Sequence, residues 1–254
     1  MRIFYALLIA IGLPVVFLAQ VKTVVPPAPK IPFTQSLQVL VVTTKDWSAV
    51  QGTARVFERK TPNAKWTPLG DSFPVVVGRS GLAWGEGAFI QGTPPKSKLE
   101  GDGNAPAGMF PLTAAFGSSS KPNAVEMPYT KLDEFMECVD DVKSNFYNQI
   151  VNRMQVGNFD WKSSEKMLAV GEQYGLGVFV AYNSFPVEKG RGSCIFLHIW
   201  KDAASGTSGC TAMERRNLEL IISRFAPAKN PYLVQMPEAN YDRYRKTWNL
   251  PKLK

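Results

Sequence analysis

Four side chains in the sequence can supply a thiol or an imidazole, and their types point to nucleophilic catalysis. They are Cys138, Cys194, His198 and Cys210. Cys210 follows the segment Gly206-Thr207-Ser208-Gly209, whose small side chains would let another molecule approach the sulfur. A thiol within hydrogen-bond reach of an imidazole base is an activated nucleophile. We therefore predict that Cys210 is a nucleophile and that His198, the one histidine in the chain, is its base.

The flanking sequence predicts how this pair is positioned. The histidine is expected late in a strand over 194–200, because that segment is rich in β-branched and aromatic residues. Apolar residues recur at helical spacing over 211–225, and Thr211 with Glu214 forms a capping-box pattern. A helix that begins directly after Cys210 would favour its thiolate through the helix dipole. It would also offer free backbone N–H groups to an oxyanion.

The other two cysteines favour a disulfide. Cys138 and Cys194 have no chemically suggestive neighbours, and an exported protein with three cysteines can oxidise two of them. Two buried free thiols are the alternative. A zinc site is disfavoured, because Cys194 and His198 would lie about 13 Å apart along one strand. Glu100 and Asp102 are too few for a calcium loop, so neither a metal nor a cofactor is expected.

The formal net charge of +8 lies mostly at the two ends of the chain. Residues 1–36 carry a net charge of +3 and residues 229–254 a net charge of +4, which leaves the body over 37–228 at +1. A nucleic-acid-binding groove needs lysines and arginines clustered on the folded surface. The charge distribution therefore disfavours nucleic acid as a partner.

The N-terminal residues indicate export. Residues 1–19 combine Arg2 with an apolar run that is typical of a secretory signal, with an uncleaved membrane anchor as the alternative. Residues 20–36 form a proline-rich linker that is expected to be extended and unpacked. The folded domain is expected over 37–237, and a basic C-terminal tail with a short helix over 238–254. These features place the domain outside the cytoplasm, with a membrane tether if the anchor is retained.

The elements around the site predict a mainly β fold. Strands are expected over 37–44, 54–58, 73–77, 177–182, 194–200 and 232–235. Helices are expected over 131–138, 163–174, 211–225 and 239–248. The glycine- and proline-dense stretch over 86–117 is interpreted as turns, with a substrate-facing loop system as the alternative. Because strands dominate the centre, we predict a β-sandwich or barrel with peripheral helices, α+β overall.

Two segments resemble the active-site signature of the YkuD-type L,D-transpeptidases. They are Phe196-Leu197-His198-Ile199-Trp200 and Gly206-Thr207-Ser208-Gly209-Cys210-Thr211-Ala212-Met213. The signature is a histidine, a loop and then Ser/Thr-His-Gly-Cys. Residues 98–110 and 178–183 are similar to a divergent branch of that family, so the similarity covers about residues 37–237.

The resemblance implies an L,D-transpeptidase type of fold and cysteine acyl transfer on peptidoglycan stem peptides, in the periplasm or cell envelope of a bacterium. It implies Cys210 as the nucleophile, His198 as the base, and the backbone carbonyl beside the histidine, at Ile199, as the third element. The thiolate would expel a terminal D-alanine, and a side-chain amine of a neighbouring stem would resolve the thioester. The residues implied for the oxyanion hole and the adjoining substrate site are Thr207, Ser208, Gly209 and Cys210.

Two positions depart from the family pattern. Ser208 stands where the family has a histidine, and Ala212 where it has an arginine able to contact a carboxylate. Arg215 is a candidate to supply that contact, with a solvated helix face as the alternative. Trp200 is a candidate to line the cleft, with core packing as the alternative.

Two further functions stay open. With water in place of the amine, the same Cys–His pair would make a carboxypeptidase or endopeptidase. Without catalysis, the chain would be a cell-wall-binding domain or an envelope scaffold in which the site has decayed. Retention of both the cysteine and the histidine favours an enzyme.

Overall fold

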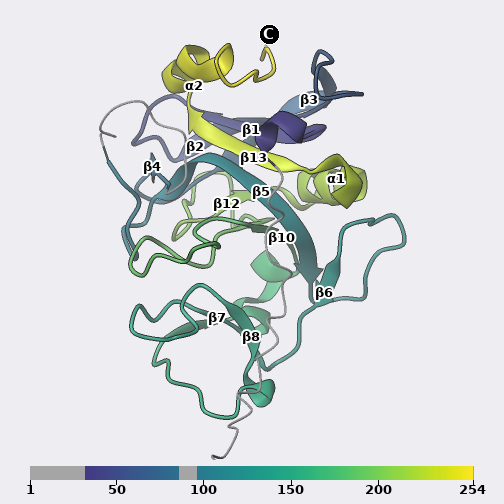
Figure 1. The fold of residues 1–254 in the computed structure, drawn as a ribbon. Coiled ribbons are helices and arrows are strands. Elements are labelled where there is room, and N and C mark those ends of the chain that lie inside the picture. Colours follow the sequence, from purple (N-terminus) through teal and green to yellow (C-terminus); the bar gives the residue numbers. More distant parts are fainter. Residues whose placement is uncertain (1–31, 86–95, 254) are drawn as a thin grey trace, which may run out of the picture.

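The computed structural model describes residues 32–85 and 96–253 (Figure 1). The expected signal or anchor over 1–19, and the expected linker up to residue 31, lie outside these residues. Within them, no helix has the length and apolar character needed to cross a membrane. Export and tethering therefore stay predictions from the sequence.

The last residues of the expected linker are folded rather than extended and unpacked. Phe33–Gln35 form a short 3₁₀ helix, η1, and the Phe33 side chain is buried. Its ring packs against Trp66 and Tyr232, with ring centroids 6.0 and 5.4 Å apart. The packed domain therefore begins before residue 37, because burial of a large aromatic side chain stabilises the folded state.

A β-barrel forms the centre of the molecule, which confirms the mainly β class. Its strands are β1 (Gln38–Thr44), β2 (Gln51–Glu58), β3 (Thr67–Val76), β5 (Ala105–Gly117), β10 (Leu176–Val180), β11 (Phe196–Ile199), β12 (Thr211–Met213) and β13 (Tyr232–Pro237). They are hydrogen-bonded in the order β10, β11, β12, β3, β2, β1, β13, β5. A further antiparallel pairing of β10 with β5 closes the ring.

Apolar side chains pack on both sides of the barrel wall. Every residue of β1 is buried, as the apolar run over 39–42 predicts, and its polar residues Gln38, Thr43 and Thr44 are buried as well. In β11, Leu197 and Ile199 belong to the main core, whereas Phe196 belongs to a second cluster on the other face of the strand. Cys210 belongs to that second cluster as well. The predicted nucleophile therefore faces away from the main core.

The described part of the glycine- and proline-dense stretch contains the 13-residue strand β5, so its interpretation as turns is wrong over 105–117. Its prolines lack an N–H donor, but their carbonyls still accept hydrogen bonds. Pro106 O accepts from Gln235 Nε2 at 3.0 Å, and Pro111 O accepts from Ala181 N at 2.9 Å. Two short strands add to β5 in parallel: β4 (Leu82–Trp84) and β6 (Tyr129–Lys131).

A second sheet lies below the barrel in Figure 1 and has three strands. They are β7 (Met136–Val139), β8 (Ile150–Asn152) and β9 (Ser164–Lys166), with β7 in the middle, and the short 3₁₀ helix η2 (Arg153–Gln155) follows β8. The helix expected over 131–138 is therefore wrong. The helix expected over 163–174 is right only in its second part, where the 3₁₀ helix η3 (Met167–Tyr174) follows β9. Short apolar runs fit either periodicity, and here the strand partners decide between them.

Helices cover the barrel at two places. The helix α1 (Arg215–Arg224) begins four residues later than expected, because Thr211–Met213 pairs as a strand with β11 and β3. After the 3₁₀ helix η4 (Pro227–Lys229) and β13, the helix α2 (Glu238–Arg245) confirms the helix expected over 239–248. Tyr241 in α2 is 0% exposed. The C-terminal segment is thus packed against the domain rather than a free tail.

Candidate active site

The predicted nucleophile and base are held by two neighbouring parallel strands. In the β11–β12 pair, Leu197 lies opposite Thr211 and His198 opposite Ala212. Cys210 comes directly before the first paired residue of β12, next to Phe196. Because successive side chains of a strand alternate in direction, Cys210 and His198 share the face of the second apolar cluster. The topology therefore brings the two predicted residues to one side of the barrel.

Cys210 is a free thiol, but its surroundings differ from those expected. Its side chain is 6% exposed; Sγ accepts a hydrogen bond from Phe196 N at 3.3 Å and donates to Cys194 O at 3.4 Å. No helix begins after it, and the Thr211 hydroxyl donates to Gln235 Oε1 at 2.6 Å instead of capping a helix. Burial, with the negative charge of Glu165, raises the pKa of the thiol to about 12. The predicted helix-stabilised thiolate is therefore wrong: the resting group is a thiol.

His198 is held in one orientation by the residue that follows it. Its Nδ1 lies 2.8 Å from the Ile199 carbonyl oxygen, which can only accept, so Nδ1 carries the proton and Nε2 is the free base of the neutral ring. This carbonyl is the third element that the resemblance implied. The side chain is 7% exposed, and burial lowers the pKa of the imidazole.

Tyr174 contacts the imidazole with its ring and interacts with the thiol through its hydroxyl. Its ring lies against His198, with centroids 5.3 Å apart, and its hydroxyl lowers the pKa of Cys210. Among the residues that the structure describes, no hydrogen bond joins His198 to Cys210. The predicted pair therefore lies on the same face of the barrel without a hydrogen bond between the two side chains.

Cys210 lines a cavity of about 270 Å³ together with Ser208 and Gly209. Charged side chains from distant parts of the chain line the same cavity. They are Arg79, Lys98, Glu100, Asp140 and Glu165. The cavity is therefore strongly polar around a single free sulfur.

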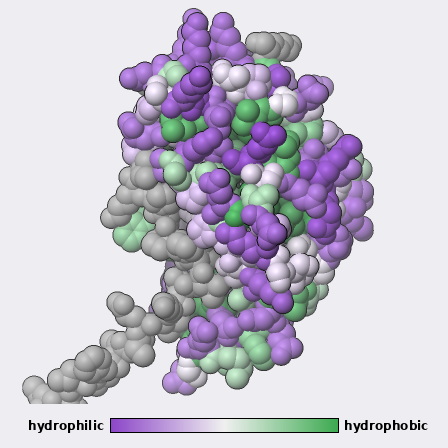
Figure 2. Space-filling model, turned by 90° about the vertical axis from the view of Figure 1, so that its right-hand side faces the viewer, coloured by the Kyte–Doolittle hydropathy of each residue, from purple (hydrophilic) through white to green (hydrophobic). Residues whose placement is uncertain are grey.

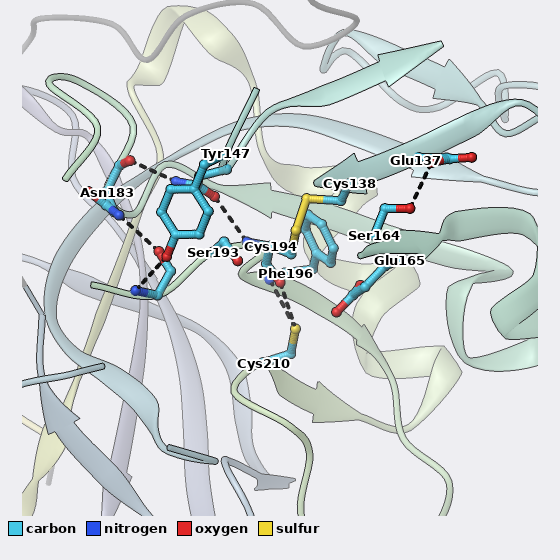
Figure 3. The surroundings of a disulfide bond; sticks show 12 residues. Glu137, Cys138, Tyr147, Ser164, Glu165, Asn183, Ser193, Cys194, Phe196 and Cys210 are labelled. Carbon is cyan, nitrogen blue, oxygen red and sulfur yellow. Dashed lines mark hydrogen bonds between the residues drawn. A yellow bond between two sulfur atoms is a disulfide. The ribbon is translucent and has the colours of Figure 1, made fainter. Parts of the chain in front are cut away.

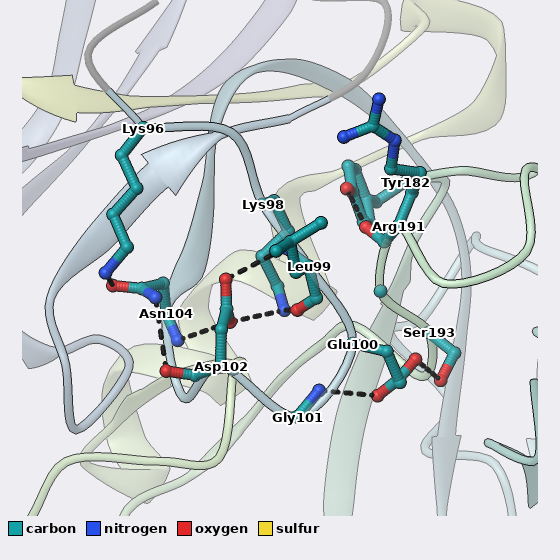
Figure 4. Close-up of polar contacts among 12 residues, drawn as sticks. Lys96, Lys98, Leu99, Glu100, Gly101, Asp102, Asn104, Tyr182, Arg191 and Ser193 are labelled. Carbon is teal, nitrogen blue, oxygen red and sulfur yellow. Dashed lines mark hydrogen bonds and ion pairs between the residues drawn. The ribbon is translucent and has the colours of Figure 1, made fainter.

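The loop before β5 forms one wall of the cavity through a network of polar contacts (Figure 4). Lys98 Nζ lies 2.8 Å from Asp102 Oδ1 and donates to Leu99 O at 2.6 Å. Glu100 Oε2 accepts hydrogen bonds from Tyr147 Oη at 2.6 Å and Ser193 Oγ at 2.7 Å. Both carboxylates are thus bound by protein groups. Within residues 32–85 and 96–253, no group of histidine, cysteine and acidic side chains is arranged to hold a metal ion.

Thr207 and Gly209 shape the turn that leads to the thiol. Thr207 Oγ1 donates to Cys210 O at 2.7 Å and accepts from Gly209 N at 3.1 Å. The Gly209 N–H, which was expected in the oxyanion hole, is therefore occupied in this structure. A Cβ at Gly209 would lie 3.3 Å from Asn104 O, so the close approach of the two backbones favours glycine.

The predicted disulfide between Cys138 and Cys194 is confirmed (Figure 3). It joins β7 of the small sheet to the segment that leads into β11, and Cys194 also lines the cavity. The small sheet is thereby held beside Cys210. This bond brings the carboxylates of that sheet to the thiol.

Sequence reasoning missed Glu165 and Tyr174, which the small sheet and η3 place beside the thiol. Glu165 Oε2 accepts a hydrogen bond from Tyr174 Oη at 2.6 Å. Burial, with the nearby charges of Asp140 and Glu100, raises the pKa of Glu165 to about 7. The local pattern Ser164-Glu165-Lys166 is ordinary for an exposed strand, so no signal in the sequence marks this carboxylate.

Two other candidates lie outside the cavity. Trp200 is half-buried after β11, and its backbone N–H donates a hydrogen bond to Met213 O at 2.9 Å. Arg215 pairs on the surface with Glu172 of η3, at 2.6 Å between Nη2 and Oε1. Arg79, which is exposed at the cavity, is the arginine that the structure does place near Cys210.

No family model matches the chain, and no match was found among curated proteins or solved structures. The similarity to the L,D-transpeptidases is thus a resemblance that rests on the residues around His198 and Cys210.

Proposed function

We propose that the chain is a cysteine-dependent acyl transferase of the L,D-transpeptidase type that acts on peptidoglycan stem peptides. The observation that carries the proposal is the free thiol of Cys210 at a polar cavity, one strand away from a histidine whose Nδ1 is bound by the carbonyl of the next residue. This supports nucleophilic catalysis, because an oriented imidazole and a free thiol are the groups that acyl transfer needs.

The proposed reaction has two steps. In the first, the thiol gives up its proton, the sulfur attacks the carbonyl carbon after the L-centre of the third stem residue, and the C–N bond to the terminal D-alanine breaks. The departing amine takes up a proton, which leaves a thioester on Cys210. In the second, an amine of a neighbouring stem attacks the thioester, the C–S bond breaks, and the thiol is restored. The net result is one amide bond exchanged for another.

One cation at the cavity, Arg79, is suited to bind a carboxylate group of a peptide. The exposed side chain of Arg79 lines the cavity, whereas Arg215 pairs with Glu172 on the outer surface. A guanidinium binds a carboxylate through two parallel hydrogen bonds. We therefore assign to Arg79 the carboxylate contact that the sequence had suggested for Arg215.

Muropeptide analysis tests the proposal. Purified peptidoglycan sacculi are incubated with the exported domain or with its Cys210→Ala variant, digested with a muramidase and separated by mass. New cross-links between diamino acid residues that require Cys210 are the expected result. Shortened monomers without new cross-links would instead indicate a hydrolase, and an unchanged profile with both proteins would indicate a non-catalytic wall-binding domain.

A further inference from the structure

The thiol of Cys210 needs a proton acceptor that the resting structure does not provide through His198. The Tyr174 ring packs on the imidazole, and its hydroxyl is near enough to the sulfur to lower the pKa of Cys210 by hydrogen bonding. The Tyr174 hydroxyl is hydrogen-bonded not to the histidine but to Glu165 Oε2, at 2.6 Å. The contacts therefore lead from the sulfur through the tyrosine to a carboxylate.

Glu165 reaches the thiol because strand pairing places it there. In the small sheet it lies opposite Cys138, whose disulfide partner Cys194 accepts a hydrogen bond from Cys210 Sγ. Glu165 and Cys210 line the same cavity. Figure 3 shows the Glu165 carboxylate on the cavity side of its strand, near Cys210 and the disulfide.

The groups that face Glu165 make it a base suited to neutral pH. They are Tyr174 from η3, Asp140 after β7, Lys98 and Glu100 from the loop before β5, Arg79 after β3, and Cys210. Burial and the two neighbouring carboxylates hold the pKa of Glu165 at about 7, whereas burial lowers the pKa of His198. A general base is most effective when its pKa lies near the working pH.

We propose that Glu165 accepts the proton of Cys210 through the hydroxyl of Tyr174, as a relay that prepares the nucleophile. This inference rests on the proposed role of Cys210 as the nucleophile. Tyr174 is the bridging group of the relay, and Glu165 acts on the thiol only through it.

The transfer balances without any added reagent. Rotation about the Cβ–Sγ bond turns the S–H from the Cys194 carbonyl towards the Tyr174 oxygen. The S–H bond then breaks as a new O–H bond forms on Tyr174, and the original tyrosine proton moves to Glu165 Oε2. The products are a thiolate, a neutral tyrosine and a neutral carboxylic acid. The total charge is unchanged, and Glu165 loses the negative charge that raises the pKa of the thiol.

Alkylation of Cys210 by iodoacetamide measures this step without any peptidoglycan. The intact, disulfide-bonded domain is alkylated across a range of pH around neutrality, and the rate is followed by mass. The relay predicts that the wild-type rate rises with an inflection near pH 7, where Glu165 becomes ionised. It predicts that Glu165→Gln removes the inflection and slows alkylation above neutral pH by about 100-fold, the lower end of what a general base contributes.

The opposite result would overturn the relay. If Glu165 acted only as a repelling charge, Glu165→Gln would lower the pKa of the thiol and speed up alkylation. An unchanged rate would overturn it equally. The matched control is Glu172→Gln, which alters an exposed glutamate of η3 that pairs with Arg215 and should leave the rate unchanged.

Tyr174→Phe provides a second, independent arm. It keeps the aromatic ring against His198 and Phe196 but removes the bridging hydroxyl. The relay predicts that Tyr174→Phe removes the inflection near pH 7 although the Glu165 carboxylate is still present. The conservative variant Glu165→Asp should be alkylated faster than Glu165→Gln, because it keeps a carboxylate. If Glu165→Gln does not fold, Tyr174→Phe decides alone, and a wild-type profile in that variant would overturn the relay. A normal alkylation profile with no muropeptide product would contradict the proposed function while leaving the relay intact.

Discussion

Two glutamates on opposite faces of the small sheet have opposite electrostatic surroundings. Glu137 in β7 lies opposite Lys166 of β9, and the next residue along, Cys138, lies opposite Glu165. Because side chains alternate along a strand, Glu137 points away from the barrel and Glu165 points into the cavity. The same residue type is therefore placed in two environments by a shift of one position.

Glu137 is satisfied by four donors. Its carboxylate accepts from Trp161 Nε1 at 2.8 Å, Ser164 Oγ at 2.7 Å, Lys166 Nζ at 2.7 Å and Arg153 Nη1 at 3.1 Å. The side chain is only 2% exposed. Burial alone would raise its pKa, but these hydrogen bonds outweigh it and lower the pKa to about 2.

Glu165 has one donor, Tyr174, and two neighbouring carboxylates. Its pKa is raised to about 7 by burial that these contacts do not offset. Glu137 has four donors and a lowered pKa, whereas Glu165 has one donor, two neighbouring carboxylates and a raised pKa. In the proposed relay, the face that carries Glu165 serves reactivity, whereas the donors around Glu137 stabilise the other face.

The largest effect is expected when the donor-rich face is broken. Glu137→Ala should lower the free energy of unfolding by about 3–5 kcal/mol, because it leaves a cavity and removes the acceptor of the buried Trp161 indole N–H and of the Ser164 hydroxyl. Urea unfolding at neutral pH measures the loss. Glu134→Ala, an exposed glutamate just before β7, is the matched control and should change the free energy by less than about 0.5 kcal/mol.

Acid should remove the same stabilisation in the wild type. The pKa of Glu137 is lowered from 4.5 to about 2 on folding, so its contribution is complete above pH 4.5 and is lost as the pH falls towards 2. Glu137→Gln should flatten the unfolding free energy over that interval. A variant whose acid profile follows that of the wild type would show that the four donors do not stabilise the ionised form.

A smaller loss is expected when the bridge between the two regions is removed. The double variant Cys138→Ala, Cys194→Ala opens the link across 56 residues and should cost about 2–4 kcal/mol. Because Glu165 depends on that link for its position, the inflection in Cys210 alkylation should also weaken. Unfolding and alkylation of the same sample give both values, and a full loss of stability with an unaltered alkylation profile would show that Glu165 is positioned by other contacts.

The cavity-facing glutamate should behave in the opposite way. Its pKa rises from 4.5 to about 7 on folding, so stability is highest below pH 4.5 and falls as the pH rises through 7. Glu165→Gln should therefore raise the free energy of unfolding above neutral pH by about 1–3 kcal/mol, while it slows alkylation. Differential scanning calorimetry on either side of pH 7 checks the sign. A Glu165→Gln variant that is less stable than the wild type would contradict the expectation that ionised Glu165 destabilises the fold.

The smallest effect is expected at the exposed ion pair between α1 and η3. Arg215→Ala removes the contact with Glu172, which is worth less than about 1 kcal/mol at a solvent-exposed site. Muropeptide products should be unaffected, because Arg215 does not line the cavity. Loss of product in this variant, with Arg79→Ala still active, would indicate that Arg215 rather than Arg79 binds the carboxylate.

Much of the barrel was predictable because local sequence patterns indicate its strands. The apolar runs of β1, β10, β11 and β13 predicted strands that the structure confirms. The strand β5 was not predictable, since its prolines and glycines are typical of turns and are accommodated only by its neighbours in the barrel. β7 and β12 were predicted as helix, because strands of three or four residues span only about one helical turn, which is too short for apolar periodicity to distinguish the two structures.

From the sequence by itself we predicted a nucleophile at Cys210 with His198 as its base, and we favoured a Cys138–Cys194 disulfide that the structure confirms, since so few residues of these types are present. Only the tertiary structure decided that the thiol is buried without a helix dipole, and that Tyr174 and Glu165 lie beside it. The physical reason is that residue type and periodicity report on local burial. The donors and charges around a carboxylate come instead from strands that are distant in the chain, and these meet only when the sheets pair.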